Sequence, residues 1–403
     1  MPTRSQVCAW IAGLGLVVPS LAMAQARTER EVVDLIVRDG PQARAIRAAA
    51  DVTRHEQLAR LAYPNPGVTY SREGAGFTEF LQVEQSVPLF AARGAVSRAG
   101  VAATAAVEAE RDARLWMLRA DAAVFAARLT AEQGRLETAQ TYTRDIERLI
   151  DILRTREREG EGSRFDRLRA EQELRDGRLL VTSAAVAVAD ARAALSAMLP
   201  RDVTLSRIAG APDGQQPPPP VETMMTRAAS TRAELRSLER FSERADLEAE
   251  AARRARLPSP TISGGLKRAD DESGRARGGV FGVSLTVPLF DAGGREAARW
   301  TAERVRVEAE RASVEHQIRG EISHASEALA LRQAALSEDQ ESAGDELTRI
   351  AEVAYREGEV GILELLDAVR TASRARMRST DVRLDARLAQ IALERAVGDI
   401  LWP

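Results

Sequence analysis

Cysteine is almost absent from this chain of 403 residues, and its scarcity removes several kinds of site. The only cysteine, Cys8, lies in an N-terminal segment that has the pattern of a cleaved leader. The mature chain is therefore expected to hold no disulfide bond, no thiolate metal site and no cysteine that could carry a lipid.

Aromatic residues are also scarce, at 4% of the chain, while charged residues reach 29%. Few aromatics argue against one large globular core, and the dominance of Ala, Arg, Glu and Leu is typical of long helices. A net charge of -3 and a pI near 5.9 give no general reason to expect nucleic-acid binding.

Patterns for catalysis and for cofactor binding are missing as well. The three histidines, His55, His316 and His324, are scattered without the spacing of metal ligands and are expected to be solvated or packed. Gly293-Gly294 follows a predicted strand but lacks the rest of any phosphate-binding fingerprint. We therefore predict a protein that is not an enzyme and needs no metal or other cofactor.

Long hydrophobic runs are missing outside residues 1–24, which we interpret as a secretory signal. Arg4 supplies the positive start, Val7 to Val18 the apolar middle, and Ala22-Met23-Ala24 a small-residue cleavage site. An uncleaved anchor is the alternative, although the run is short for a membrane span. No later stretch approaches 18 apolar residues, so a membrane helix is not expected. Such a chain could cross a bilayer only as a closed β-barrel.

One motif occurs twice and organises the chain. Val87-Pro88-Leu89-Phe90 returns 200 positions later as 287–290, and Pro88 and Pro288 mark the two predicted strand-to-helix junctions. An alternating run precedes each motif, and an Ala-, Arg- and Glu-rich helical pattern of more than sixty residues follows it. We predict two structural repeats, 25–210 and 221–403, joined by a Pro-rich linker at 199–220.

The predicted elements follow the same order in both repeats. In the first, they are helices 27–38 and 41–62, a β-hairpin at 66–88, a long helix at 91–157 and a helix at 163–198. In the second, they are a helix at 222–257, a β-hairpin at 260–288 with a loop at 269–278, a long helix at 292–357 and a helix at 362–400.

Each long helix carries a heptad seam typical of coiled coils. In the first helix it runs through ten positions, namely Leu115, Leu118, Ala122, Phe125, Leu129, Leu136, Ala139, Ile146, Ile150 and Leu153. In the second helix, the seam recurs 200 positions later at Ile318, Ile322, Leu329, Leu336 and Ile350. A helix of this length would span roughly 100 Å.

Two of the shorter helices, laid end to end, match one long helix. We expect 163–198 and 222–257 to line the first long helix, and 362–400 with the N-terminal helices to line the second. The fold class is thus mainly α with a small β part: an elongated coiled-coil rod with four strands at one end.

The strands have one apolar and one polar face. Leu81 and Val83 alternate with Gln82 and Glu84, and 281–287 alternates in the same way. Four strands cannot close a barrel, so several protomers would have to pool their strands. The alternative is a soluble sheet that caps the coiled coil, and the thin girdle of aromatic residues favours it.

Together these residues resemble the TolC family of outer-membrane efflux ducts. The resemblance rests on the repeated strand-Val-Pro-Leu-Phe-helix unit, the Pro64-Asn65-Pro66 and Pro258-Ser259-Pro260 strand entries, and Tyr355-Arg-Glu-Gly358 followed by 363–368. It covers essentially all of the mature chain. Residues 160–171 are similar to the heavy-metal-efflux branch of the family.

The resemblance implies a homotrimer with a twelve-stranded barrel in the outer membrane and a large periplasmic α-helical tunnel. It also implies as partners a periplasmic adaptor protein, an inner-membrane pump and outer-membrane lipid. The turns at 157–163 and 355–361 would form the periplasmic entrance and the adaptor-docking tip, at Gly160, Gly162, Ser163, Tyr355, Gly358 and Gly361.

Glu364 and Asp367 fall where the family places acidic residues that ring the closed entrance. Three copies would put six carboxylates around one axis, which would favour cations. The alternative is that acids in the first turn of a helix only complement its dipole. In the first repeat Asp166 matches Glu364, but Arg169 stands at the position of Asp367.

Two functions compete at this point. The first is a passive outer-membrane duct of a tripartite efflux system. The second is a periplasmic coiled-coil adaptor or scaffold that does not span a membrane.

Overall fold

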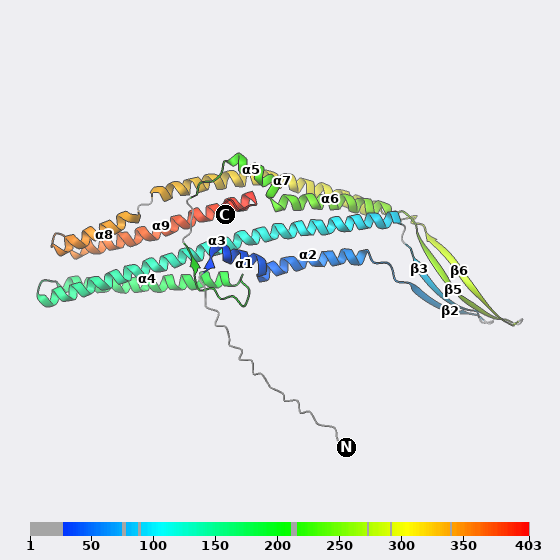
Figure 1. Ribbon diagram of the computed structural model, residues 1–403, viewed down its shortest axis with the longest axis horizontal. Coiled ribbons are helices and arrows are strands. Elements are labelled where there is room, and N and C mark those ends of the chain that lie inside the picture. Colours follow the sequence, from blue (N-terminus) through cyan, green and yellow to red (C-terminus); the bar gives the residue numbers. More distant parts are fainter. Residues whose placement is uncertain are drawn as a thin grey trace, which may run out of the picture.

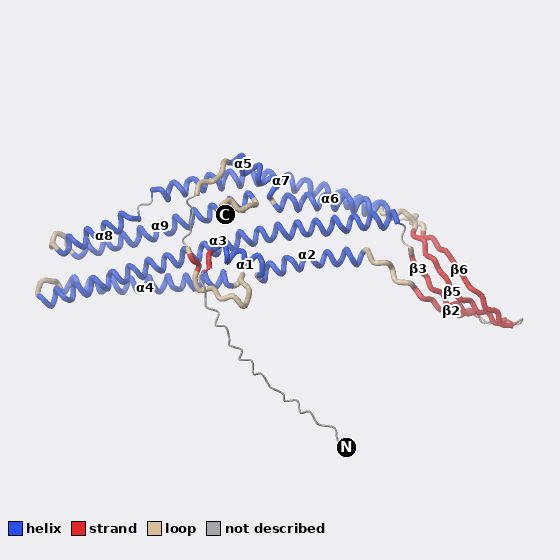
Figure 2. Tube along the Cα trace, in the orientation of Figure 1, coloured by secondary structure: helices blue, strands red, loops and turns tan. Residues whose placement is uncertain are grey.

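The chain folds into a long helical rod with four strands at one end, as a computed structural model shows (Figure 1, Figure 2). The structure describes residues 27–74, 78–87, 90–210, 216–271, 274–290, 292–338 and 341–402. The predicted leader and Pro88 lie outside these residues. Pro288 lies between the last strand and the helix that follows it.

The elements of the first half begin with a short strand and end with a helical hairpin. They are β1 (Arg27–Thr28), α1 (Glu29–Asp39), α2 (Pro41–Arg60), β2 (Gly67–Glu73), β3 (Thr78–Ser86), α3 (Phe90–Glu159) and α4 (Arg164–Ser196). The elements of the second half are β4 (Ile208–Ala209), α5 (Val221–Thr231), α6 (Ala233–Arg254), β5 (Ser259–Asp271), β6 (Gly274–Thr286), α7 (Gly294–Glu338), α8 (Glu341–Arg356) and α9 (Ile362–Val397).

The proline-free, Ala-rich stretch after the first hairpin forms α3, a helix of 70 residues that is about 105 Å long. The other helices pack around it in a layer (Figure 1). In the half nearer the strands the order across the layer is α2, α3, α6 and α7. In the other half α4 and α9 flank α3, and α8 packs on α9. Among the described residues, the layer therefore ends at each margin in a helix with one side uncovered.

The predicted seam forms the core along most of the rod. Leu129, Ile146 and Leu153 of α3 are buried, as are Ile322 and Leu329 of α7. Ile350 departs from the prediction, because it is exposed on α8. The reason is its place in the layer: α8 lies at the margin and packs mainly on α9.

The N-terminal helices pack differently from the prediction. Both α1 and α2 lie against α3, the first long helix, rather than against the second. Gly40 separates them: a side chain there would clash with the carbonyl oxygen of Ile36, since its Cβ would lie 2.4 Å away. Helices 163–198 and 222–257 do line α3 as expected, through α4 and α6.

The predicted helix at 222–257 is two helices that meet at Arg232. This residue leaves the helical conformation, with φ -59° and ψ 108°, although no Pro or Gly is present. Its buried guanidinium donates to the carbonyl oxygen of Arg395 at 2.6 Å and pairs with Glu321 at 2.9 Å. Gly398 packs on the break, where a Cβ would lie 2.9 Å from Arg232 Cα. The break is therefore held by contacts with distant segments.

The predicted helix at 292–357 is described as α7 and α8, on either side of residues 339–340, which lie outside the described residues. By length and composition alone, helix α4 is long and apolar enough to cross a membrane. It lies along α3 in the rod, and only 11% of its apolar window is buried.

The four long strands form an antiparallel sheet in the order β2, β3, β5, β6. The register puts Val83 beside Val68 and Leu81 beside Tyr70, so the apolar side chains share a face as predicted. The second hairpin is longer than predicted: the strands continue through 269–278 to Asp271 and from Gly274. An ion pair between Asp270 and Arg275 at 3.1 Å joins these extensions.

Candidate functional site at the hairpin tips

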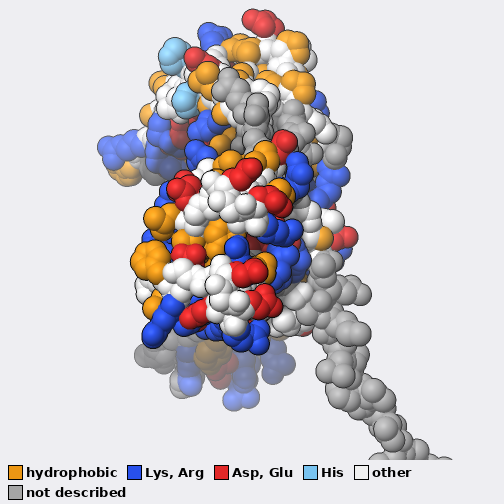
Figure 3. Space-filling view, turned by 90° about the vertical axis from the view of Figure 1, so that its left-hand side faces the viewer, with side chains coloured by type: hydrophobic (Ala, Val, Ile, Leu, Met, Phe, Trp, Pro, Cys, Tyr) orange, Lys and Arg blue, Asp and Glu red, His pale blue; other side chains and the backbone are white. Residues whose placement is uncertain are grey.

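The two helical hairpins, α3–α4 and α8–α9, end side by side at the end of the rod farthest from the strands (Figure 1). Seen from that end, the surface carries both signs of charge with hydrophobic groups between them (Figure 3). A buried cluster holds the hairpins together through Ile146, Ile150, Tyr355, Leu365 and Leu366. The tips therefore form one packed unit.

Glycines make both turns. Gly160 and Gly358 have φ of +80° and +77°, in the left-handed region that side chains avoid. Gly162 is close-packed, because a Cβ there would lie 2.9 Å from the backbone nitrogen of Glu157. Ser163 then starts α4 as its N-cap and accepts a hydrogen bond from the backbone N–H of Phe165 at 3.1 Å. The sequence prediction placed these turns correctly.

Tyr355, one of the predicted tip residues, lies between the two hairpins. Its ring is buried, and its hydroxyl donates a hydrogen bond to Asp166 of α4 at 3.4 Å. Burial raises the pKa of Tyr355, and the neighbouring Asp166 carboxylate raises it further. Tyr355 thus stays a neutral donor to an acceptor in the other hairpin, which links α8 to α4.

Glu364 and Asp367 lie on the exposed face of the first turns of α9. Leu365 and Leu366 point the other way into the core. Within the part of the chain that the structure describes, neither carboxylate has a hydrogen bond or an ion pair with another residue. Gly361, the N-cap, has no side chain to form a capping bond. The helix dipole alone would favour Glu364 in this position.

A buried polar group that the sequence analysis missed lies deeper between the hairpins. Glu173 of α4 is 4% exposed, and it accepts hydrogen bonds from Tyr142 of α3 and from Arg370 of α9. Arg370 approaches with two nitrogens, a bidentate geometry that is strong and directional. We call Tyr142, Glu173 and Arg370 the inter-hairpin clamp, because they join three helices.

The residues of the clamp shift one another's pKa values. Hydrogen bonding from Arg370 lowers the pKa of Glu173, against the opposing effect of burial. Burial and the Glu173 carboxylate raise the pKa of Tyr142. The clamp is therefore one carboxylate, one guanidinium and one neutral phenol at neutral pH.

A glycine inside α4 could have indicated the clamp from the sequence. Gly177 sits in the middle of a helix, where glycine is unfavourable. A Cβ at this position would lie 3.0 Å from Thr143 Oγ1 and 3.3 Å from the ring of Tyr142. The missing side chain allows α3 and α4 to approach closely at Tyr142.

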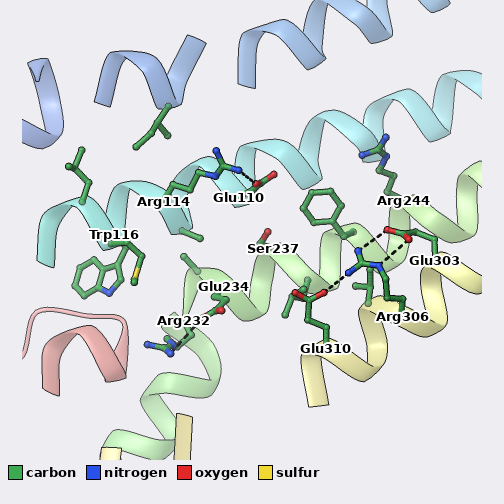
Figure 4. Close-up of a pocket in the computed structure, with 18 of the residues that line it drawn as sticks. Glu110, Arg114, Trp116, Arg232, Glu234, Ser237, Arg244, Glu303, Arg306 and Glu310 are labelled. Carbon is green, nitrogen blue, oxygen red and sulfur yellow. Dashed lines mark hydrogen bonds and ion pairs between the residues drawn. The ribbon is translucent and has the colours of Figure 1, made fainter. Parts of the chain in front are cut away.

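Near the middle of the rod a groove of about 1020 Å³ lies between α2, α3, α6 and α7 (Figure 4). Its charged side chains are mostly paired with one another: Arg306 with Glu303 and Glu310, and Arg114 with Glu110. The lining contains no histidine or cysteine. It offers a neutralised wall rather than a set of reacting groups.

Metal ligands do not gather in the described part of the chain. No group there combines three or more His, Cys, Asp or Glu side chains in a position to hold an ion. The three histidines are all exposed, on α2 and α7.

Comparison with known proteins shows the fold and finds a family match in the second half of the chain. Residues 225–399 match the model of the family described as outer membrane efflux protein. This part of the chain is similar to the outer membrane efflux protein family. Its matched segment runs from α5 to the end of α9 and includes Tyr355, Glu364 and Asp367.

Solved structures of outer membrane channels share the fold over nearly the whole chain. The Neisseria gonorrhoeae MtrE channel in its open state is 20% identical, with a TM-score of 0.67, over 99% of this chain and 98% of that one. The Campylobacter jejuni CmeC channel is 14% identical, with a TM-score of 0.68, over 98% and 94%. The Vibrio cholerae VceC protein is 16% identical, with a TM-score of 0.68, over 92% and 96%. No curated protein sequence matches the chain.

Proposed function

We propose that three copies of this chain form a passive outer-membrane duct of a tripartite efflux system. Substrate would enter from a periplasmic adaptor and an inner-membrane pump at the hairpin tips and leave through the strands. The match of residues 225–399 to the efflux family and the fold shared with three outer membrane proteins support an efflux channel.

The observation that carries the proposal is that a single protomer leaves its sheet edges and its outermost helices uncovered. The sheet ends in β2 and β6, and the helical layer ends in α2 and α7 near the strands and in α4 and α8 near the tips. Unpaired strand edges and bare helix sides must find partners. Further copies of the same chain can close all three levels at once, whereas a monomer leaves all of them open.

The apolar side chains on these margins support the same conclusion. On α4, Leu179 and Val186 are 69% and 56% exposed, and on α8, Ile350 and Val353 are exposed as well. Three protomers with four strands each would give a twelve-stranded barrel, within the range of barrels that cross membranes.

The hairpin tips fit the role of an entrance in this proposal. With the layer closed into a tube, Glu364 and Asp367 would recur three times around the axis, where an unpaired ring of carboxylates favours cations. The glycine turns and Ser163 would form the surface on which an adaptor docks. Tyr355 and Asp166 would hold the two hairpins of one protomer together.

The competing function is a periplasmic coiled-coil adaptor or scaffold that does not span a membrane. The strand faces argue against it. Tyr70, Leu266, Phe281 and Val283 are all exposed on one face of the sheet, which is costly in water but favourable in lipid.

Cell fractionation and mass measurement together test the proposal. The full chain, with its leader, is produced in a Gram-negative host, and the membranes are washed with high salt and alkaline carbonate. We expect the protein to stay in the outer-membrane fraction and to have the mass of three chains after detergent extraction. Release by the salt wash favours the scaffold. A monodisperse monomer whose circular dichroism still shows β-strands would contradict the proposed duct.

A further inference from the structure

The register of the sheet reveals a row rich in arginine at the edge of its apolar face. Three cross-strand rows of this face are almost entirely apolar. Counting from the helix side, they contain Ile262 and Val283, then Val83 and Phe281, then Leu81 and Leu266. From Leu285 to Gly279 this band covers seven residues, or about 20 Å along the strand.

The next row toward the hairpin turns is charged instead of apolar. Arg72 pairs with Glu79, Glu79 with Arg268, and Arg268 with Arg277, so one row crosses all four strands. The row holds three arginines and one glutamate. We call these four residues the basic row.

Arg268 and Arg277 are the two residues of the basic row that face each other with like charge. A like-charge pair directly opposite across two strands destabilises a sheet. Glu79 lies 4.0 Å from Arg268 and also accepts a hydrogen bond from Tyr70 at 3.4 Å. Arg277 is exposed and has no ion pair or hydrogen bond in the described part of the chain. An anion is needed beside Arg268 and Arg277.

The surroundings show which kind of anion fits. The row continues the apolar face directly, and Tyr70 in the last apolar row brings an aromatic ring with a polar tip to the boundary. A ligand there must have an apolar part that follows the band and a negative group at its end. In the row beyond, Arg275 is already paired with Asp270.

We infer that the basic row binds the phosphorylated headgroup of a lipid in the membrane leaflet farther from the helical rod. The inference rests on the proposed function, because it needs the strands to lie in a membrane. The acyl chains would lie along the apolar band, and the phosphate would accept charge-assisted hydrogen bonds from Arg268 and Arg277. The phosphate would also relieve the repulsion between the two guanidiniums.

Lys267 provides a matched control, because it adjoins Arg268 in the same strand but lies on the other face. Its ammonium group stands over the ring of Phe80, 5.3 Å from the centroid. R268Q with R277Q removes charge from the apolar face, whereas K267Q removes charge from the polar face.

The test is native mass spectrometry of the purified full-length trimer with lipid A carrying two phosphates and with its dephosphorylated form. We expect the wild type and K267Q to bind the phosphorylated lipid equally. The double variant should bind the phosphorylated lipid at least about tenfold more weakly than the wild type does. The wild type should bind the dephosphorylated lipid more weakly by a similar factor. Inorganic phosphate at the concentration of the lipid should not displace it.

Equal binding by the wild type and the double variant overturns the inference, as does equal binding of both lipids. Displacement by inorganic phosphate would also overturn it, since the row would then be a general anion site. All three outcomes leave the proposed function standing if the protein is a trimer in the membrane. A wild-type chain that forms no membrane trimer overturns the proposed function, and this inference with it.

Discussion

At the residue scale, the two carboxylates at the start of α9 are the simplest groups to test. Glu364 and Asp367 are three positions apart and project from the same face of the helix. If they ring the entrance of a trimer, E364A with D367A should increase conductance in planar bilayers and weaken block by multivalent cations. Trimer stability should change little, because neither side chain has a partner within its own protomer.

The control removes two negative charges nearby, at Glu352 of α8 and at Glu359 of the turn that follows it, which are also exposed. This variant should leave cation block closer to that of the wild type. Unaltered conductance and unaltered block in E364A with D367A would mean that these acids serve only the helix dipole.

The inter-hairpin clamp makes a prediction about stability and pH. Glu173 is buried and paired, so E173Q should leave Arg370 without its counter-ion and cost about 3 kcal/mol of unfolding free energy. Because the folded-state pKa of Glu173 is lowered, its contribution is present above the ordinary glutamate pKa of about 4.3. It is lost as the pH falls through the lowered value.

Urea unfolding, followed by the helical signal between pH 3 and pH 7, measures both effects. The wild type should lose stability in the acid range, and E173Q should lose less of it there. The exposed variant E359Q should behave like the wild type. An E173Q protein with wild-type stability at pH 7 would show that the clamp does not hold the hairpins together.

At the scale of elements, two glycines inside helices should respond in opposite ways to alanine. At Gly177 of α4 a Cβ would press on Thr143 and Tyr142, so G177A should destabilise the protein by about 1–3 kcal/mol. At Gly320 of α7 no atom lies within 4 Å of a Cβ, so G320A should stabilise the helix by about 1 kcal/mol. Thermal unfolding of the two variants gives the comparison, and equal shifts would contradict the close approach of α3 and α4.

The two faces of the sheet should differ in their tolerance of charge. Val83 and Val283 lie on the apolar face, and Gln82 and Ser284 lie on the opposite one. Arginine at Val83 or Val283 should cost roughly 2–4 kcal/mol near the middle of a bilayer and reduce membrane assembly. Arginine at Gln82 or Ser284 should be tolerated. The yield of heat-resistant trimer in the membrane fraction measures this, and equal losses on both faces would mean that neither faces lipid.

At the scale of the whole molecule, the margins of the helical layer should control assembly. L179D with V186D places two charges on the free side of α4, and it should prevent trimer formation while the protomer keeps its helical signal. V101D is the control, because Val101 is 67% exposed but belongs to α3, which has neighbours on both sides within the layer. Light scattering in detergent reports the mass, and a trimeric L179D/V186D protein would remove α4 from the interface.

Local patterns were enough to predict much of this molecule. Alternation along 80–86 and 280–286 predicted the strands and their faces, since side chains alternate in any strand whatever its partners. Gly160 and Gly358 predicted the turns, because few other residues adopt positive φ. The heptad seam predicted the buried face of α3. These features depend only on neighbours in the sequence.

Only the tertiary structure decided the features that depend on distant partners. The helix break at Arg232 rests on contacts with Glu321 and Arg395, and Glu173 becomes a clamp only when Arg370 of α9 meets it. The basic row exists only because the register aligns Arg268 with Arg277 and Glu79. Ile350 follows the seam pattern and is still exposed, because α8 lies at the margin of the layer. The sequence by itself determined which residues form helices, strands and turns, whereas packing between segments far apart in the chain decided which side chains are buried, paired or left free for another molecule.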